Sequence, residues 1–182
     1  MMTRLPANFE LDRYGLHVRL VREEDAEFIV KLRTDENLSQ YLNKIGSNIK
    51  KQIEWIREYK KREALGEEYY FIFEIIGECK VGLVRIYQIE ENRFTSGSWI
   101  VKSDVIGVGI ICDIIAREIA FEMYPLSLNY YDIRKGNKNV IRYAESYSPV
   151  RYAVDDENYY YYINKDSFDK YKVKYLRMLV KK

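Results

Sequence analysis

One segment of the sequence limits the fold more than any other. Residues 107–124 (GVGIICDIIAREIAFEMY) follow a helical pattern in which apolar residues nearly encircle the helix, so it must be buried, and a β-sheet is the partner we expect. We expect four charged residues to mark its solvent-facing edge: Asp113, Arg117, Glu118 and Glu122. The longest apolar stretch, residues 105–112, is shorter than the ~18 residues of a membrane-spanning helix.

Strand patterns stand on both sides of this helix. The N-terminal half predicts a strand at 16–21, a helix at 23–33, a second helix from Gly46-Ser47, and strands at 68–76, 80–90 and 94–102. The C-terminal half predicts a strand at 127–134, a short helix at 137–147, a hairpin at 149–164 and a terminal helix at 166–182.

This order of elements predicts a mixed α/β (α+β) fold. We expect a single domain, residues 1–182, with an N-terminal arm at 1–14. Its central sheet has about seven strands, mostly antiparallel, with one β-α-β crossover formed by the buried helix. Helices cover both faces of the sheet.

Composition removes several classes of function. His17 is the sole histidine, so a zinc site with the usual spacing of Cys and His ligands is excluded, and we expect no metal. A Ser-His-Asp triad would depend on that one residue. The formal net charge of +2 argues against nucleic acid or an anionic membrane as the partner. Cys79 and Cys112 are expected to be buried free thiols. The N-terminus lacks the apolar core of a secretory signal, so we expect a cytoplasmic protein.

Two glycines at the start of the buried helix form the first candidate site. Gly107 and Gly109 stand between a strand ending near Lys102 and the start of the buried helix, and glycine lets backbone N–H groups approach a ligand closely at the positive end of the helix dipole. A phosphate or pyrophosphate suits this arrangement, and the alternative is a turn that uses glycine only for its geometry. A dinucleotide fold is disfavoured, because Cys112 stands where the last glycine of G-x-G-x-x-G belongs.

The second candidate site follows the next strand, at residues 134–139 (RKGNKN). Asn137 can cap the helix that starts there or can contact a ligand between the two strands. The chain also has 18 tyrosines, four of them consecutive at 159–162. On a strand two of those four face the core and two face outward, where recognition of sugars or partners by stacking is the alternative to packing.

The order and spacing of these elements resemble the GNAT N-acetyltransferase superfamily, in particular the branch of ribosomal-protein N-terminal acetyltransferases. The resemblance covers roughly residues 15–165 and rests on LVREEDAEFIVKLR, KVGLVRIY, GVGIICDIIAREIAFE and DIRKGNKNVIRYAESY. It implies that acetyl-CoA, as co-substrate, lies between two splayed strands. It also implies that a neutral amine attacks the thioester directly, while a strand N–H stabilises the oxyanion.

The resemblance further implies the residues of the acetyl-CoA site. Ile100, Val101 and Lys102 would form the strand edge that pairs with the pantetheine. The pyrophosphate loop would consist of Ile106, Gly107, Val108, Gly109 and Ile110. Asn137 would contact the cofactor from the end of the second strand.

The chain departs from the family pattern at three places. Asp104 replaces an Arg or Gln, Ala144 replaces a tyrosine, and Ser148-Pro149 replaces Gly-Phe. We expect Asp104 to point away from the pyrophosphate or to pair with Lys102, because a carboxylate would repel that ligand.

The tyrosine that Ala144 replaces usually returns a proton to the CoA thiolate. Tyr143 is adjacent, but one residue turns it toward a different face of the helix. Tyr147 lies on nearly the same face as Ala144, and helical side chains lean toward the N-terminus, so we predict Tyr147 as the catalytic acid.

The predicted acceptor is a small-molecule amine. The spacing of residues 55–73 (WIREYKKREALGEEYYFIF) also resembles GNAT proteins of surface-polysaccharide synthesis, which favours an amino-sugar nucleotide. Two alternatives stay open: the N-terminus of a protein as acceptor, and a GNAT-like binding module with little catalysis. A homodimer is left open as well.

Overall fold

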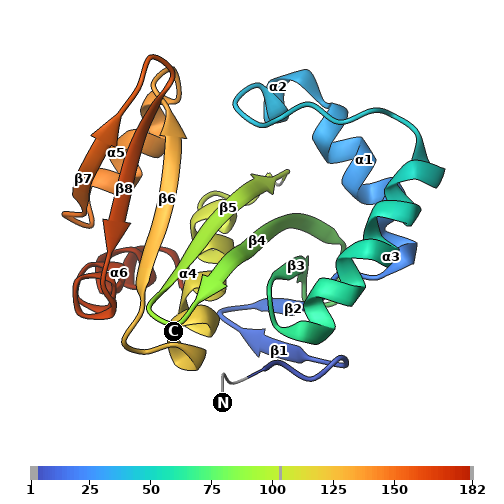
Figure 1. The fold of residues 1–182 in the computed structure, drawn as a ribbon, viewed down its shortest axis with the longest axis horizontal. Helices are drawn as coiled ribbons and strands as arrows, with labels where there is room; N and C mark the ends of the chain where they lie inside the picture. The colour runs from blue at the N-terminus through green and yellow to red at the C-terminus, as the bar shows by residue number, and fades with distance from the viewer. Residues whose placement is uncertain (1–3, 103, 181–182) are drawn as a thin grey trace.

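One sheet organises the computed structural model, which describes residues 4–102 and 104–180 (Figure 1). Its strand order is β1-β2-β3-β4-β5-β6-β8-β7. The strands are β1 Glu10–Arg13, β2 Leu16–Leu20, β3 Tyr69–Ile75, β4 Lys80–Glu90, β5 Arg93–Val101, β6 Leu128–Arg134, β7 Val150–Val154 and β8 Asn158–Ile163. The helices are a 3₁₀ turn Glu23–Asp25, α1 Ala26–Thr34, α2 Glu36–Ser39, α3 Ile49–Leu65, α4 Val108–Met123, α5 Lys138–Glu145 and α6 Lys165–Leu179.

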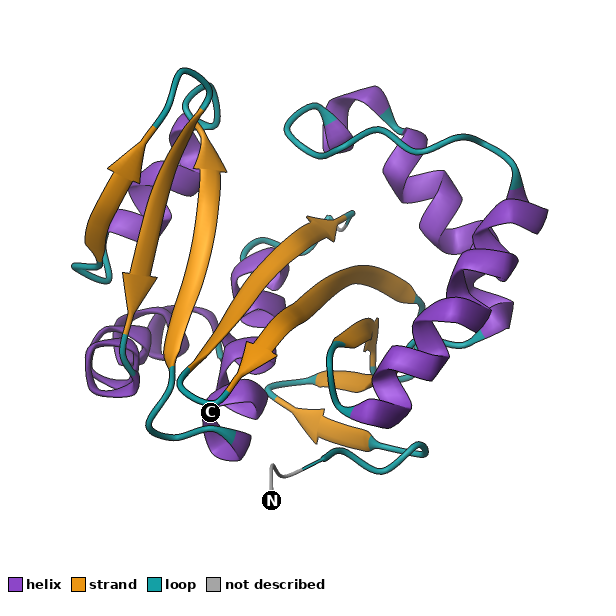
Figure 2. Ribbon diagram, viewed as in Figure 1, coloured by secondary structure: helices purple, strands orange, loops and turns teal. Residues whose placement is uncertain are grey.

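The single crossover is confirmed. Every pair of neighbouring strands is antiparallel except β5 and β6, which run parallel and are joined by α4 (Figure 2). Parallel neighbours need such a connection, and α4 is the buried helix that the sequence places there. None of the helices within the described residues is long and apolar enough to cross a membrane.

Helices on both faces of the sheet are also confirmed, and each face has its own core. On one face, Phe94 of β5 contacts Phe121 of α4 with ring centroids 5.0 Å apart, and Phe121 contacts Phe168 of α6 at 5.4 Å. On the other face, Ile29 of α1 and Ile56 of α3 are buried with strand residues of β3. The two cores hold the sheet between α4–α6 and α1–α3.

The sheet has eight strands, because the segment that the sequence predicts as an arm contains β1, which pairs with β2. Its sequence, ELDR, shows little apolar alternation, since an edge strand half exposed to water does not need it. The helix predicted to start at Gly46-Ser47 is α3, and it begins at Ile49. The side chain of Asn48 accepts a hydrogen bond from the N–H of Lys51 at 3.2 Å and so caps the N-terminus of this helix.

The prediction of a solvent-facing edge on α4 is wrong for three of its four residues. Asp113, Arg117 and Glu118 are 2%, 4% and 6% exposed, and only Glu122 reaches solvent. Glu118 accepts hydrogen bonds from Arg13 at 2.9 Å and from the Tyr14 hydroxyl at 3.0 Å, which compensate its burial. Asp113 and Arg117 lie under the sheet as an ion pair.

Predictions for the cysteines and tyrosines are met in part. Cys112 is buried as expected, and burial raises the pKa of its thiol, but Cys79 is an exposed free cysteine. In the tyrosine run, Tyr161 is fully buried against the α4–α6 face. Tyr160 and Tyr162 contact Tyr152 on the opposite face, so the two-in, two-out alternation is confirmed.

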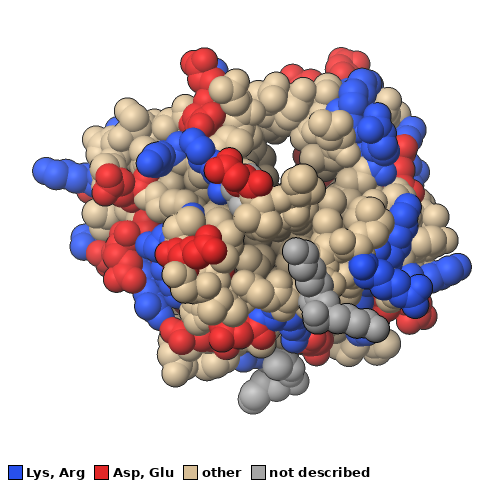
Figure 3. Space-filling model, turned by 180° about the vertical axis from the view of Figure 1, so that it is seen from behind, with Lys and Arg blue, Asp and Glu red and all other residues tan. Residues whose placement is uncertain are grey.

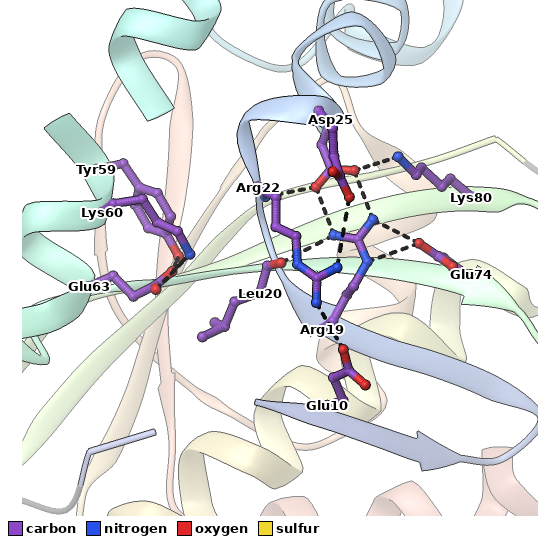
Figure 4. A network of polar contacts seen from close by, with 11 residues as sticks. Glu10, Arg19, Leu20, Arg22, Asp25, Tyr59, Lys60, Glu63, Glu74 and Lys80 are labelled. Atoms are coloured by element: carbon purple, nitrogen blue, oxygen red, sulfur yellow. Dashed lines mark hydrogen bonds and ion pairs between the residues drawn. The ribbon is translucent and has the colours of Figure 1, made fainter. Parts of the chain in front are cut away.

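A network of ion pairs around the buried residues Arg19 and Asp25 joins the N-terminal strands to α1 (Figure 4). Arg19 of β2 donates to both carboxylate oxygens of Asp25, at 2.8 and 2.9 Å, and to Glu74 of β3. Lys80 of β4 also pairs with Asp25, which is fully buried. This network fixes the start of α1 against three strands.

Candidate active site

The sheet opens between β5 and β6. Their parallel pairing spans only Arg93–Thr95 and Leu128–Tyr130, and beyond it the two strands diverge (Figure 1). The register between β4 and β5 shifts at the same level, so that Leu83 faces Ile100 but Arg85 faces Gly97. Ser98 lies in this bulge with φ of 49°, a left-handed conformation. The bulge bends β5 away from β6 and creates the gap.

A cavity of about 210 Å³ occupies this gap. Side chains from α1, β4, β5, α4, β6, α5 and the segment after α2 line it, among them Arg33, Trp99, Asp113, Arg117, Tyr131, Asn137, Tyr143 and Ala144. Seen from behind, the surface has an opening between the β6–β8 end of the molecule and the α1–α2 end (Figure 3). Lys and Arg are interspersed with Asp and Glu on that face.

Four polar side chains meet at the wall of this cavity, and we call them the α4 polar cluster: Asp113, Arg117, Tyr131 and Tyr143. The Nε of Arg117 donates to Asp113 at 3.0 Å, and the hydroxyl of Tyr143 donates to the same carboxylate at 2.8 Å. The Arg117 guanidinium lies 4.7 Å from the ring centroid of Tyr131. Burial disfavours the charge of Arg117, but Asp113 and the surrounding tyrosines together outweigh that effect and keep the pKa of Arg117 above its usual value.

Two donors of the α4 polar cluster are unused. Arg117 Nη1 and the Tyr131 hydroxyl are buried, and neither has a hydrogen-bond partner among the described residues. Burial raises the pKa of Tyr131 to about 12, against the opposing effect of the Arg117 charge, so the phenol keeps its proton at neutral pH. An unpaired buried donor costs about 1–3 kcal/mol. Such a cost is typical of a site that a ligand completes.

A second cavity, of about 200 Å³, lies beside the first, under α1 and α3. The two cavities share Arg33, Asn43 and Ser98 as lining residues. The second also contains Trp55 and Arg85, whose guanidinium lies 5.6 Å from the Trp55 ring centroid. The Nε atoms of Arg33 and Arg85 are buried and lack partners within the part of the chain that the structure describes. This cavity therefore offers unused cationic donors beside an aromatic ring.

Of the predicted cofactor residues, only Asn137 lines the first cavity. Its side chain accepts a hydrogen bond from the N–H of Val140 at 3.3 Å, so the capping prediction is confirmed. Trp99 bounds the cavity toward the glycine loop. Its ring centroid is 5.5 Å from that of Tyr143, and a Cβ on Gly109 would lie 3.7 Å from its indole.

The strand edge and the glycine loop continue from the cavity beyond Trp99. The N–H of Lys102 bonds to Val81 of β4 at 2.7 Å, and strand alternation therefore turns the N–H of Val101 toward the open gap. Ile100 is buried against the α1–α3 face. Lys102 lies 3.6 Å from Asp35 in an ion pair, rather than beside Asp104.

The two glycines of the loop differ. Gly107 has φ of +84° and precedes α4, and a Cβ there would lie 2.4 Å from Leu179 of α6. Gly109 has ordinary φ and room for a Cβ, so of these two residues only Gly107 needs the conformational freedom of glycine. In the same loop Ile106 is 91% exposed, whereas Val108 is buried and Ile110 packs against the core. The cofactor role of these residues stays a prediction.

Tyr147 does not line either cavity. It is fully buried, and its hydroxyl lies 3.2 Å from that of Tyr143, which does line the first cavity. The expectation that Tyr143 faces elsewhere is wrong, because residues four apart share a helix face and both tyrosines turn inward. Burial raises the pKa of both phenols above the ordinary value. The catalytic role of Tyr147 stays a prediction, with Tyr143 between it and the cavity.

The family follows from comparison with known proteins. The sequence profile described as "Acetyltransferase (GNAT) domain" matches residues 16–147. The chain belongs to the GNAT acetyltransferase family. The solved structure of apo FdhC, described as a nucleotide-linked sugar GNAT, is 36% identical, with a TM-score of 0.80 over 94% of this chain and 99% of that one. No curated protein matches.

Two further solved structures share the fold of this GNAT protein at lower identity. Spermidine N-acetyltransferase from Vibrio cholerae, in complex with CoA and spermine, has a TM-score of 0.71 at 17% identity, over 86% of this chain and 99% of that one. The N-acetyltransferase PseH from Campylobacter jejuni has a TM-score of 0.65 at 15% identity, over 83% and 99%. Family membership makes the protein an acyltransferase.

Sequence reasoning missed the α4 polar cluster and the residues of the second cavity. Asp113 and Arg117 are four apart in an otherwise apolar helix, a pattern equally typical of an exposed edge. Tyr131 stands in a strand where any apolar residue would fit the pattern. Among residues 4–102 and 104–180, no group of three His, Cys, Asp or Glu could hold a metal ion.

Proposed function

We propose that this protein transfers the acetyl group of acetyl-CoA to a primary amine of a sugar nucleotide. The observation that carries the proposal is the meeting of two cavities at the bulge of β5, through Arg33, Asn43 and Ser98. One cavity suits the thioester and the other an anionic acceptor. The likeness to FdhC over the whole chain supports the same acceptor class.

On the donor side, the pantetheine lies along Ile100, Val101 and Lys102 in this proposal, and the pyrophosphate lies at the loop of residues 106–110. The free edge of β5 supports the first assignment, since the Val101 N–H is turned toward the gap. The N-terminus of α4 supports the second, since its N–H groups and dipole favour an anion. Asn137 contacts the cofactor where its loop meets the cavity.

On the acceptor side, Arg33 and Arg85 hold the diphosphate, and Trp55 stacks on the base or sugar. Guanidinium groups with unused N–H donors suit a phosphate, which accepts several charge-assisted hydrogen bonds. The diphosphate would satisfy the Nε atoms that have no partner within the described residues. The amine then reaches the thioester past Ser98, which lines both cavities.

The test is release of CoA thiol from acetyl-CoA with amino-sugar nucleotides, peptides and polyamines as acceptors. We expect turnover with the sugar nucleotides. Arg33→Gln should raise the KM for that acceptor about 10-fold, because it removes one charge-assisted hydrogen bond, and should leave the KM for acetyl-CoA unchanged. Arg57→Gln is the matched control, because Arg57 is exposed and pairs with Glu23 outside both cavities. Turnover only with peptides would show that the acceptor is the N-terminus of a protein. Failure to bind acetyl-CoA would show that the protein is a GNAT-like binding module.

Single-domain organisation, a cytoplasmic location and a homodimer stay predictions that accompany this proposal. Sedimentation of the purified chain measures the oligomeric state directly. A mass of twice 21.9 kDa would establish the homodimer.

A further inference from the structure

The family position for the proton donor holds Ala144 here, yet three tyrosines surround it. Ala144 lines the first cavity together with Tyr131 and Tyr143, and Tyr147 lies behind Tyr143. The leaving CoA thiolate has a pKa of about 8.5, so a phenol within reach can supply its proton. The hydrogen bonds of the three phenols distinguish them.

Tyr143 and Tyr147 have their hydroxyl groups engaged. Tyr143 donates its proton to the Asp113 carboxylate at 2.8 Å, so that proton is already engaged in a hydrogen bond. Tyr147 has no surface on the cavity and contacts it only through Tyr143. A proton from Tyr147 would have to pass through the Tyr143 hydroxyl, whose own proton points at a carboxylate.

Tyr131 differs from both. It stands on β6 one residue beyond the last pair with β5, at the closed end of the gap. Its hydroxyl is buried, lines the cavity, and has no partner in the described structure. Its ring is held between the Arg117 guanidinium, 4.7 Å from the centroid, and the stacked ring of Tyr161 at 5.5 Å. The phenol is thus fixed in place with its proton free.

We infer that Tyr131 is the catalytic acid of this enzyme and that Arg117 is its positioning residue. The inference rests on the proposed function in one respect, that acetyl-CoA occupies the gap between β5 and β6. The inference assigns the acid to strand β6, before Asn137, instead of to helix α5, which follows Asn137. Ala144 then leaves room for the thioester sulfur next to Tyr131.

The proton and electron movements balance. The nitrogen lone pair of the acceptor amine forms a bond to the thioester carbon, the C–S bond breaks, and its electron pair goes to sulfur. The sulfur takes the Tyr131 proton, which gives CoA thiol and a phenolate beside the Arg117 cation. The acceptor nitrogen loses one proton to water as the amide forms, and water returns one proton to the phenolate, so that no net proton is taken up or released. The guanidinium stabilises the phenolate while it exists.

The experiment compares Tyr131→Phe with the parent enzyme, using acetyl-CoA and the best amine acceptor. The Phe ring keeps the contact with Arg117 and removes only the hydroxyl. We expect kcat to fall about 100-fold, within the range for a positioned acid, with the dissociation constant of acetyl-CoA unchanged. Tyr161→Phe is the matched control, because Tyr161 stacks on Tyr131 but donates to Glu145 outside the cavity. Its kcat should equal that of the parent.

The selenoester analogue of acetyl-CoA separates chemistry from structure. A selenolate is much less basic than a thiolate and leaves without a proton donor, so the loss in Tyr131→Phe should nearly vanish with this donor. An equal loss with both donors would make Tyr131 a structural residue and overturn the inference. A Phe variant as fast as the parent would also overturn it. If the parent itself does not bind acetyl-CoA, the proposed function fails instead.

Discussion

Two buried Arg–Asp pairs hold opposite sides of the molecule, and they are satisfied to different degrees. Arg19 and Asp25, near the N-terminus, are 5% and 0% exposed, and Arg117 and Asp113, in α4, are 4% and 2% exposed. Arg19 uses every N–H it has, because it donates to Asp25, to Glu74 and to the carbonyl of Leu20. Arg117 leaves Nη1 unpaired within the described residues.

The difference separates stability from function. Burying a charge is tolerated where hydrogen bonds replace those of water, and the Arg19–Asp25 pair meets that condition without help. The Arg117–Asp113 pair does not, and its unused donor lies at a cavity. Most of the other buried side-chain atoms that lack partners among the described residues support the same distinction, since those of Arg33, Arg85 and Tyr131 also lie at the two cavities and only that of Asn158 does not. The first pair should therefore govern folding and the second should govern turnover.

The largest expected effect comes from Asp25→Ala. This change leaves Arg19 and Lys80 facing each other without the carboxylate that both contact. Removing one member of a buried pair costs about 3–5 kcal/mol, and we expect a loss of that size in the free energy of unfolding. Urea unfolding followed by tryptophan fluorescence measures it. Glu23→Gln is the control from the same turn, with a carboxylate in solvent. A loss below about 1 kcal/mol would mean that the network contributes little.

For Asp113→Asn we expect a smaller loss of stability than for Asp25→Ala and a larger loss of activity than for a variant of the Arg19–Asp25 pair. The amide oxygen still accepts one of the two hydrogen bonds, from Arg117 or from Tyr143, and water in the cavity can reach the other donor. We expect the free energy of unfolding to fall by about 1.5–3 kcal/mol, the value of one charged hydrogen bond. Because Arg117 and Tyr131 then lose their fixed position, kcat should fall about 10-fold.

Asp25→Asn, assayed where it is folded, completes the comparison. Its kcat should stay within about 2-fold of the parent, because the Arg19–Asp25 pair lies outside both cavities. Equal kcat losses in Asp25→Asn and Asp113→Asn would show that the two pairs do not divide stability from function.

Local features of the sequence predicted the parts of the fold that depend on local rules. The buried α4, the crossover, the alternation at Tyr159–Tyr162 and the Asn137 cap each follow from the pattern of a few neighbouring residues. Strand β1 was not predicted, because an edge strand needs no apolar alternation.

The polar residues of the site were not predicted, because their environment depends on segments that are far apart in the sequence. Whether Arg117 faces water or a cavity is decided by where β5 and β6 stop pairing, and that depends on a bulge between β4 and β5. Nothing in the residues near Arg117 encodes this. The same holds for Tyr131, whose free hydroxyl is apparent only when the neighbouring phenols are seen to be engaged.

The smallest expected effect is the pH dependence that Asp25 adds to stability. Burial opposes the ionisation of Asp25, but hydrogen bonds from Arg19 and Lys80 more than offset it, so its pKa in the folded protein is lowered from the usual value of about 3.9. The unfolded chain therefore takes up a proton at higher pH than the folded protein does. The resulting stabilisation is fully present above about pH 4 and is lost as pH falls toward the folded pKa.

The difference in unfolding free energy between parent and Asp25→Asn isolates this contribution, because other carboxylates titrate alike in both. Glu23 and Asp169, for example, also have lowered pKa values, and both variants retain them. Measured from about pH 7 down to about pH 2, the difference should be constant at first and then shrink below about pH 4. A difference that grows as pH falls would mean that Asp25 is protonated more readily in the folded protein. Arg19 would then lack its counter-ion, and the contrast with Arg117 would disappear.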